Sequence, residues 1–264
     1  MLDVKQATKV FSAGTASEHH ALNGLDLHLD DGEFVTIIGS NGAGKSTLFN
    51  AICGNYWLDQ GQIFLDGQDI TFLSEHRRAR QIGRVFQDPM KGTAPHLTIE
   101  ENLALAYTRK DRKPFRSAVR KQEKDLFRTE LEKYHMDLEN RMKTKVGLLS
   151  GGQRQVVTLL MCTLVMPKLL LLDEHTAALD PKTADKVLQL TEEIVARDHL
   201  TTLMVTHNMK HAIQYGNRLI MMHEGRIIYD VAGEEKKNLQ VSDLLAKFEQ
   251  ASGGEFANDR MMLA

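Results

Sequence analysis

The first third of the chain gathers its apolar residues into short runs that predict β-strands. Residues 21–29 place an apolar side chain at every second position, which is the period of a strand with one buried face. Residues 33–38 form a nearly continuous apolar run, as expected of a parallel strand covered on both faces. Further strands are expected over residues 2–11, 61–65 and 81–86.

The pattern changes after residue 98, where a helical period and a strongly polar composition continue to about residue 149. Strands return at residues 169–172 and 200–205, and residues 218–222 and 226–229 read as a hairpin. Strands that alternate with helices predict an α/β domain around a mainly parallel sheet. The polar segment near residues 88–150 is expected to be a helical insertion in that domain.

The sequence after about residue 231 no longer alternates between strands and helices. Residues 233–237 look like a charged turn, and residues 242–248 like a capped amphipathic helix. Residues 252–264 are expected to be frayed. We therefore expect a short extension with one helix over residues 232–264, too small to be a separate regulatory domain.

Composition narrows the classes of protein. Hydrophobic residues make up 42% of the chain, which excludes a disordered protein. The balance of 33 Lys+Arg against 35 Asp+Glu argues against a surface devoted to nucleic acid. The longest uncharged apolar stretch, residues 156–166, is far shorter than the roughly 20 residues of a membrane span. Two cysteines, Cys53 and Cys162, and no apolar signal segment predict a soluble protein in a reduced cytosol.

A phosphate-binding loop stands directly after the predicted strand 34–38. It fits the pattern G-x-x-x-x-G-K-[ST], and a helical run follows at residues 47–52, so a chance Gly-rich turn is a poor alternative. The loop consists of Gly39, Ser40, Asn41, Gly42, Ala43, Gly44, Lys45, Ser46 and Thr47. Its backbone N–H groups would surround phosphate, Lys45 would reach the β- and γ-phosphates, and Ser46 would be a ligand of Mg²⁺.

Two acids end the apolar strand 169–172. Asp173 at the end of a parallel strand can hold the hydration shell of Mg²⁺, and Glu174 can deprotonate a water for attack on the γ-phosphate. Alone, such a pair often only marks where a strand meets solvent. Together with the loop at residues 39–47 it predicts nucleotide hydrolysis.

A third motif, Leu149-Ser150-Gly151-Gly152-Gln153, opens an apolar helix that ends at Pro167. With these three motifs the sequence resembles the ATP-binding cassette (ABC) ATPases over about residues 2–230. The resemblance implies a P-loop NTPase core with a mainly parallel sheet, an N-terminal antiparallel β-subdomain and a helical subdomain inserted at about residues 88–155. Residues 1–231 would form the cassette.

The resemblance also implies roles for single residues. Ser150, Gly151, Gly152 and Gln153 would face the ATP held by a second copy, so that two chains enclose two ATP molecules, each with Mg²⁺. Gln87 matches the glutamine that contacts Mg²⁺ and the attacking water, and His207 the histidine that senses the γ-phosphate. Phe11 matches the aromatic that stacks on adenine, with an ordinary core phenylalanine as the alternative. Asp180 matches the loop residue that touches the partner subunit.

His175 departs from the family, which commonly has proline after the catalytic glutamate. Without proline the backbone beside Glu174 loses a fixed φ. His175 either modulates the attacking water or the dimer interface, or is simply tolerated. We favour tolerance, since every other catalytic position matches.

Residues 109–124 carry a local excess of positive charge, which the near-neutral net charge of the whole chain conceals. The basic residues are Arg109, Lys110, Arg112, Lys113, Arg116, Arg120, Lys121 and Lys124. Such a run is a solvated helix face, a nucleic-acid patch, or a surface near anionic lipid headgroups. Since the family docks its helical subdomain beneath membrane subunits, the last alternative is our hypothesis.

The family implies the biological setting. The closest resemblance is to bacterial import ATPases, in a branch related to branched-chain amino acid uptake and assigned to tryptophan/tyrosine-type or uncharacterised systems. The expected function is ATP hydrolysis that powers uptake of an amino acid or similar solute, at the cytoplasmic face of the membrane. The expected partners are permease subunits, a second copy of the chain and a solute-binding protein, without nucleic acid. The alternatives are an exporter ATPase, a non-transport ABC protein acting on ribosomes or nucleic acid, and a small-molecule kinase.

Overall fold

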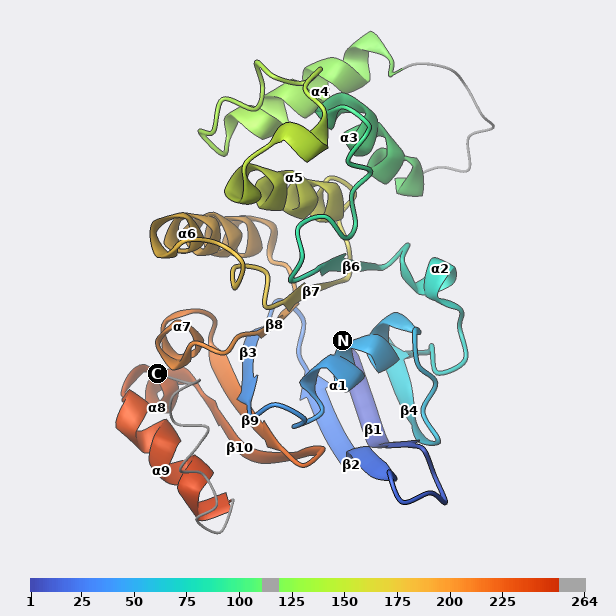
Figure 1. Cartoon of the computed structure of the whole chain (residues 1–264), viewed down its shortest axis with the longest axis vertical. Coiled ribbons are helices and arrows are strands. Elements are labelled where there is room, and N and C mark those ends of the chain that lie inside the picture. Colours follow the sequence, from blue (N-terminus) through green and yellow to red (C-terminus); the bar gives the residue numbers. More distant parts are fainter. Residues whose placement is uncertain (111–118, 252–264) are drawn as a thin grey trace. The chain divides into compact units, whose positions relative to one another are not determined.

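The computed structural model describes residues 1–110 and 119–251 of the chain (Figure 1). These residues divide into two compact units. The first combines residues 1–79 with the chain from Asp198 onward, and the second comprises residues 80–197. None of the helices in the described residues combines the length and apolar character that spanning a membrane requires.

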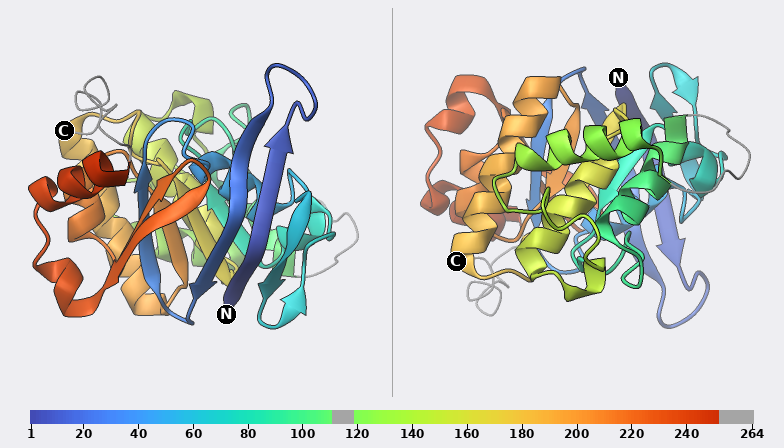
Figure 2. Two further views of the ribbon diagram at one scale, coloured as in Figure 1. Left: turned by 90° about the horizontal axis from the view of Figure 1, so that it is seen from below. Right: turned by 90° about the horizontal axis from the view of Figure 1, so that it is seen from above.

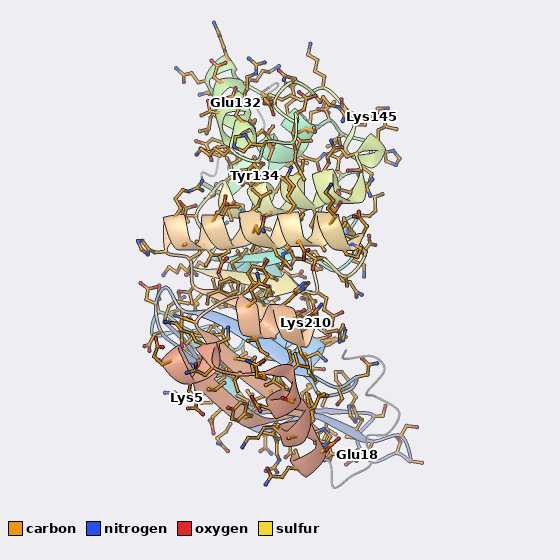
Figure 3. The ribbon with its side chains drawn as sticks, turned by 90° about the vertical axis from the view of Figure 1, so that its left-hand side faces the viewer. Lys5, Glu18, Glu132, Tyr134, Lys145 and Lys210 are labelled. Carbon is orange, nitrogen blue, oxygen red and sulfur yellow. The ribbon has the colours of Figure 1, made fainter. Side chains whose placement is uncertain are left out.

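An antiparallel sheet forms one part of the first unit. Its strands are β1 (Leu2–Phe11), β2 (His19–Leu29), β4 (Gln60–Leu65) and β5 (Gln68–Asp69), in the order β2-β1-β4-β5. β1 and β2 form a long hairpin that pairs from Leu2 opposite Leu29 to Phe11 opposite His19 (Figure 2). Glu18 lies in the loop of this hairpin (Figure 3). The sheet is the antiparallel β-subdomain that the family resemblance implied.

The same unit holds strands of a second sheet, in the order β10-β9-β3-β8. They are β3 (Phe34–Gly39), β8 (Thr202–Val205), β9 (Arg218–His223) and β10 (Arg226–Ala232). β3 runs parallel to β8 and β9, and β10 returns antiparallel as the predicted hairpin. Every residue of β3 is buried, which is why its sequence is a nearly continuous apolar run.

The helices of the first unit are α1 (Lys45–Cys53), α2 (Glu75–Arg78), α7 (Met209–Gln214), α8 (Gly233–Lys237) and α9 (Val241–Ala251). α9 contains the predicted helix and buries Leu244 and Phe248 in a cluster with Met221. The turn predicted at residues 233–237 was wrong, because the segment forms α8. Glu234 and Lys237 pair at 2.6 Å on adjacent turns, and buried Lys236 donates to the carbonyl of Gly216 at 2.8 Å.

The second unit contains the parallel strands β6 (Ile82–Val85) and β7 (Leu169–Asp173). Its helices are α3 (Ile99–Tyr107), α4 (Lys121–Glu132), α5 (Gly151–Thr163) and α6 (Pro181–Asp198), with short 3-10 turns at Thr108–Lys110 and Val146–Leu148. α3, α4 and α5 pack against one another (Figure 2). Figure 3 places Glu132 and Tyr134 at the end of α4. The helical insertion is therefore present, although much of residues 133–149 is irregular backbone.

Remote arginines cap the C-termini of α1 and α5, neither of which has a basic residue in its last turn. Arg78, only 1% exposed, donates to the carbonyls of Ala51 at 2.6 Å and Ile52 at 2.9 Å. Its other nitrogens reach the carbonyls of Thr71 and Leu73, both at 2.8 Å. Burial lowers the pKa of this guanidinium. A cation at a helix C-terminus satisfies the last carbonyls and opposes the negative end of the dipole.

The cap of α5 changes the interpretation of the basic run. Arg109 donates to the carbonyls of Met161 at 2.9 Å and Cys162 at 2.8 Å, where α5 ends. Lys124 pairs with Glu100 at 3.2 Å. At least these two basic residues have intramolecular partners, so they contribute less to a lipid-facing patch than the sequence suggests. Three of the other six basic residues, Arg112, Lys113 and Arg116, lie outside the described residues.

The N-terminus of α5 packs tightly against the first turn of α6. A Cβ atom added to Gly152 would lie 2.3 Å from Cγ2 of Thr183, closer than atoms can approach. A Cβ atom added to Gly151 would lie 3.0 Å from Cδ2 of Leu179, which is a tight contact but a less severe one. Gly152 is therefore required by packing, independently of any ligand.

We predict that Arg78→Met destabilises the protein by about 3 kcal/mol or more, because it leaves four carbonyls without their donor. Chemical denaturation of the two proteins measures this difference. Arg77→Met, at the exposed neighbouring position, is the matched control and should change stability by less than about 0.5 kcal/mol. Equal stability of both variants would contradict the capping role of Arg78.

We predict that Gly152→Ala also destabilises the protein, by about 1–3 kcal/mol, although alanine favours helices over glycine. The cause is the clash with the stiff β-branched Thr183. Thr183→Ser removes the clashing methyl, so the double variant should recover most of the loss in thermal denaturation. If the serine gives no recovery, the close contact is not the cause.

Candidate nucleotide-binding and hydrolysis site

The phosphate loop lies between β3 and α1, as its sequence predicts. Gly42 and Gly44 take left-handed backbone angles, with φ of 80° and 98°. At Gly44 a side chain is excluded for a second reason, because a Cβ would lie 2.3 Å from the carbonyl oxygen of Ala21. Gly44 is the N-cap of α1, and the first turn holds no acidic residue. The N-terminus of α1 therefore presents its first N–H groups to an anion.

The side chain of Lys45 is fixed by hydrogen bonds to carbonyl groups of the phosphate loop. Its Nζ donates to the carbonyls of Gly39 at 2.6 Å and Ser40 at 2.9 Å, and the residue is 5% exposed. These two hydrogen bonds place the ammonium beneath the loop. Ser46, the next residue, is exposed at the start of α1.

Backbone hydrogen bonds from two other segments support the loop. The N–H of Gly225, in the turn between β9 and β10, donates to the carbonyl of Ala43 at 3.1 Å. The carbonyl of Gly225 in turn accepts from the N–H of Asn23 in β2 at 3.0 Å. The phosphate loop is therefore a rigid part of the first unit.

The loop borders a cavity of about 580 Å³, a size typical of small-molecule sites. Ser40, Asn41, Gly42 and Ala43 line it. The other lining residues are Glu18, His19, His20, Asn23, His223 and Glu224. Sequence reasoning missed these six, because only the β1–β2 pairing and the β9–β10 turn bring them beside the loop.

Phe11 ends β1 and lies at the surface, half-buried, so the alternative of an ordinary core phenylalanine is wrong. The ring of Tyr56 meets it edge to face, with 5.3 Å between ring centroids. The ammonium of Lys9 lies 5.6 Å from the Phe11 ring. Phe11 is therefore a half-buried surface aromatic that contacts Tyr56 and Lys9, and its stacking on adenine stays a prediction.

His207 follows β8, whose parallel partner β3 leads into the phosphate loop. The N–H of Thr206 extends this pairing by donating to the carbonyl of Ile37 at 3.1 Å. Because the carboxyl ends of parallel strands share one edge, His207 and the loop are brought to the same edge of the sheet. Of the predicted site residues, Phe11, His207 and the phosphate loop belong to the first unit.

The second unit brings Gln87 beside the two acids. β6 and β7 pair in parallel up to Val85 opposite Leu172, so Gln87 and Asp173 follow at neighbouring strand ends. Arg84, which sequence reasoning missed, forms an ion pair with the Asp173 carboxylate at 2.7 Å. Both side chains are largely buried, so this pair orients Asp173. No motif marked Arg84, and only strand register reveals it.

Glu174 occupies a left-handed conformation with φ of 48°, which is uncommon for a residue with a side chain. Its carbonyl accepts from the N–H of Ala177 at 2.9 Å, which closes a turn directly after β7. The chain thereby leaves the strand sharply and keeps the Glu174 side chain partly exposed.

The Ser-Gly-Gly-Gln segment begins α5 with a reciprocal capping box. The N–H of Gln153 donates to Ser150 Oγ at 3.3 Å, and the N–H of Ser150 donates to Gln153 Oε1 at 3.2 Å. Ser150 and Gly151 are exposed and Gly152 is buried. The helix start therefore has the accessible, positive character that an anion requires.

Asp180 caps α6, accepting from the N–H of Thr183 at 3.1 Å. Hydrogen bonds from the Thr183 hydroxyl and N–H hold the pKa of Asp180 below its usual value. Because Thr183 also packs against Gly152, Asp180 is tied to the Ser-Gly-Gly-Gln segment at the start of α5.

The residues proposed for magnesium have suitable chemistry. Ser46, Asp173 and Gln87 supply hydroxyl, carboxylate and amide oxygens, which are the hard ligands that Mg²⁺ prefers. In the described residues, no cluster of three or more His, Cys, Asp or Glu side chains could hold a metal ion alone.

Comparison with known proteins assigns the family. The family model described as "ABC transporter" matches residues 22–177. The chain is 48% identical over 251 residues to a tyrosine transport ATP-binding protein of Clostridioides difficile, with 95% of this chain and 100% of that protein covered. It is 33% identical to a methionine import ATP-binding protein of Bacillus licheniformis, covering 86% of this chain and 66% of the longer relative.

Solved structures of ATP-binding cassettes are also similar to this chain. The ATP-binding cassette MJ0796, in a dimeric post-hydrolysis state bound to ADP and Pi, is 31% identical, with a TM-score of 0.73 over 88% of this chain and 98% of that one. The ADP form of the cassette MJ1267 gives a TM-score of 0.75 at 28% identity, over 94% of this chain and 98% of that chain. These similarities confirm the predicted fold class, ATP hydrolysis, and ATP with Mg²⁺ as ligands. The chain belongs to the ABC transporter family and is an ATP-binding cassette ATPase.

Proposed function

We propose that this ATPase powers uptake of an amino acid, and that the amino acid is aromatic, with tyrosine as the first candidate. The observation that carries the proposal is the 48% identity to the tyrosine transport ATP-binding protein, which extends over the whole of that protein. The methionine and sulfate relatives are less similar and longer, although they too belong to import systems.

In the proposed mechanism, ATP lies on the phosphate loop with Lys45 against its β- and γ-phosphates. Ser46, Asp173 and Gln87 would hold Mg²⁺, which would neutralise phosphate charge. Glu174 accepts a proton from water as the water oxygen bonds to the γ-phosphorus and the bond to the β–γ bridging oxygen breaks. His207 hydrogen-bonds the γ-phosphate, and Phe11 stacks on adenine.

A second copy of the chain completes each site. We infer that the segment from Ser150 to Gln153 of one copy binds the γ-phosphate held by the other, since a helix N-terminus attracts anions. Asp180 contacts the opposite copy in this arrangement. A dimeric cassette structure among the relatives supports the scheme. Hydrolysis removes the bridging phosphate and lets the copies separate.

We also propose that the chain is peripheral, bound to permease subunits at the cytoplasmic face of the membrane. A solute-binding protein on the other side would deliver the amino acid. The segment after Gln87 is the proposed link to the permease. Residues 1–231 would form the cassette, with residues 232–264 as its extension.

Replacing Glu174 with glutamine tests the assignment of the base. Glu174→Gln keeps the size of the side chain but removes its capacity to accept a proton, so hydrolysis should fall by at least about 100-fold. ATP binding should persist and trap a dimer, measured by analytical ultracentrifugation with Mg²⁺ and ATP. Lys45→Ala, as the control, should bind ATP poorly and stay monomeric. A Glu174→Gln protein that hydrolyses ATP normally, or remains monomeric with ATP, contradicts the scheme.

Reconstitution tests the solute. The chain should copurify with separate permease subunits. In vesicles, tyrosine-loaded binding protein should raise ATP hydrolysis at least about threefold over unloaded protein, because substrate must reach the cassette through the permease. Leucine and methionine are matched controls. Stimulation by methionine alone would overturn the aromatic assignment, and full coupling without any binding protein would favour the exporter alternative.

A further inference from the structure

His175, directly after the proposed base, is buried against α6. Its side chain is 1% exposed, and its Nε2 lies 3.3 Å from Oγ1 of Thr191. Thr191 is equally buried, in the middle of α6. The residue is therefore inaccessible to a second copy of the chain, which excludes a direct contact in the dimer interface.

The direction of the hydrogen bond between His175 and Thr191 follows from the single proton that the Thr191 hydroxyl can donate. Oγ1 of Thr191 also lies 2.8 Å from the carbonyl oxygen of Val187, one turn earlier in α6. A carbonyl only accepts, so the single hydroxyl proton of Thr191 is donated to Val187. His175 must then donate its Nε2–H to Thr191. The result is a directed chain of hydrogen bonds from the imidazole to the backbone of α6.

This anchor is attached one residue beyond a strained position. Glu174 has a φ of 48°, a conformation that costs about 1 kcal/mol or more for a residue with a side chain and persists only where neighbouring structure enforces it. On one side, Asp173 is fixed by β7 and by its ion pair with Arg84. On the other side, His175 is fixed by α6 through Thr191.

We propose that His175 is a positioning residue for Glu174. By tying the backbone after Glu174 to α6, its donated hydrogen bond holds the carboxylate in the direction needed for deprotonating the attacking water. Proline would restrict the backbone here through its ring, whereas histidine does so through a side-chain bond. This inference rests on the proposed role of Glu174 as the base, and it replaces the expectation that His175 is merely tolerated.

A positioning role predicts an effect on the chemical step alone. Small displacements of a catalytic group reduce rates strongly, by up to about 100-fold per ångström. The anchor contains none of the residues proposed to bind ATP or Mg²⁺, so ATP binding should be unaffected. Loss of the anchor should therefore lower kcat and leave the KM for ATP unchanged.

Thr191→Val and Thr191→Ser form the matched pair that tests this. Valine keeps the shape of threonine but removes the acceptor, and serine keeps the hydroxyl. We expect kcat to fall about 10-fold in Thr191→Val and less than about twofold in Thr191→Ser, with the KM for ATP within about twofold of the parent in both. Thermal denaturation of each variant shows that the comparison is between folded proteins.

A second pair of variants separates anchoring from packing. His175→Gln can donate an amide N–H to Thr191 and should retain more than about a third of kcat, whereas His175→Leu fills the space without a donor and should lose about 10-fold. The double variant that combines His175→Leu with Thr191→Val should be no slower than His175→Leu alone, because both changes remove the same bond.

The outcomes are distinct from those that test the base itself. If Glu174→Gln abolishes hydrolysis while folded Thr191→Val and His175→Leu turn over at the parent rate, the positioning proposal is overturned and the role of Glu174 stands. If Glu174→Gln hydrolyses ATP normally, the role of Glu174 fails, and the positioning proposal fails with it. A rise in the KM for ATP with unchanged kcat would also refute the proposal.

Discussion

Hydrogen bonds from buried cations to backbone carbonyls hold the phosphate-binding machinery in place. α1 is secured in this way at both ends, by Lys45 beneath the loop and by Arg78 at its last turn. Arg109 does the same for the end of α5. α1 has no side-chain cap at its N-terminus, so its stabilisation comes from the C-terminus and from the surrounding backbone.

The same need for exact placement governs the two acids after β7. Their position depends on the parallel pairing of β6 and β7, which sets Gln87 beside Asp173. Their orientation depends on side chains that belong to no motif, Arg84 on Asp173 and His175 next to Glu174. The proposed chemistry of Asp173 and Glu174 thus depends on Arg84 and His175, which are not part of the two-acid motif.

Predictions from the sequence succeeded where local pattern and burial agree. The apolar run before the phosphate loop became β3, with every residue buried, and the alternating run after residue 20 became β2. They failed at residues 233–237, where the burial of Lys236 against Gly216 stabilises a helical turn that local sequence does not signal. The sequence also suggested the wrong role for Arg109, which was expected on a charged surface. A basic residue in a charged run resembles a solvated side chain, because the sequence does not show the distant carbonyls to which Arg109 donates.

The sequence alone determined the chemistry of this protein, because a phosphate loop, a pair of acids and a helix-capping Ser-Gly-Gly each require particular residue types at fixed local spacing. It also determined the type of the elements that it predicted, with the exception of residues 233–237, because strand and helix periodicity is local. Only the tertiary structure decided which side chains support those motifs. Arg78, Arg84 and Thr191 act on groups remote from them in the chain, and hydrogen bonds across such separations leave no periodic pattern in a sequence. His175 is the clearest example. In the sequence it is only a departure from the family pattern, whereas in the structure it is a buried hydrogen-bond donor whose acceptor is Thr191.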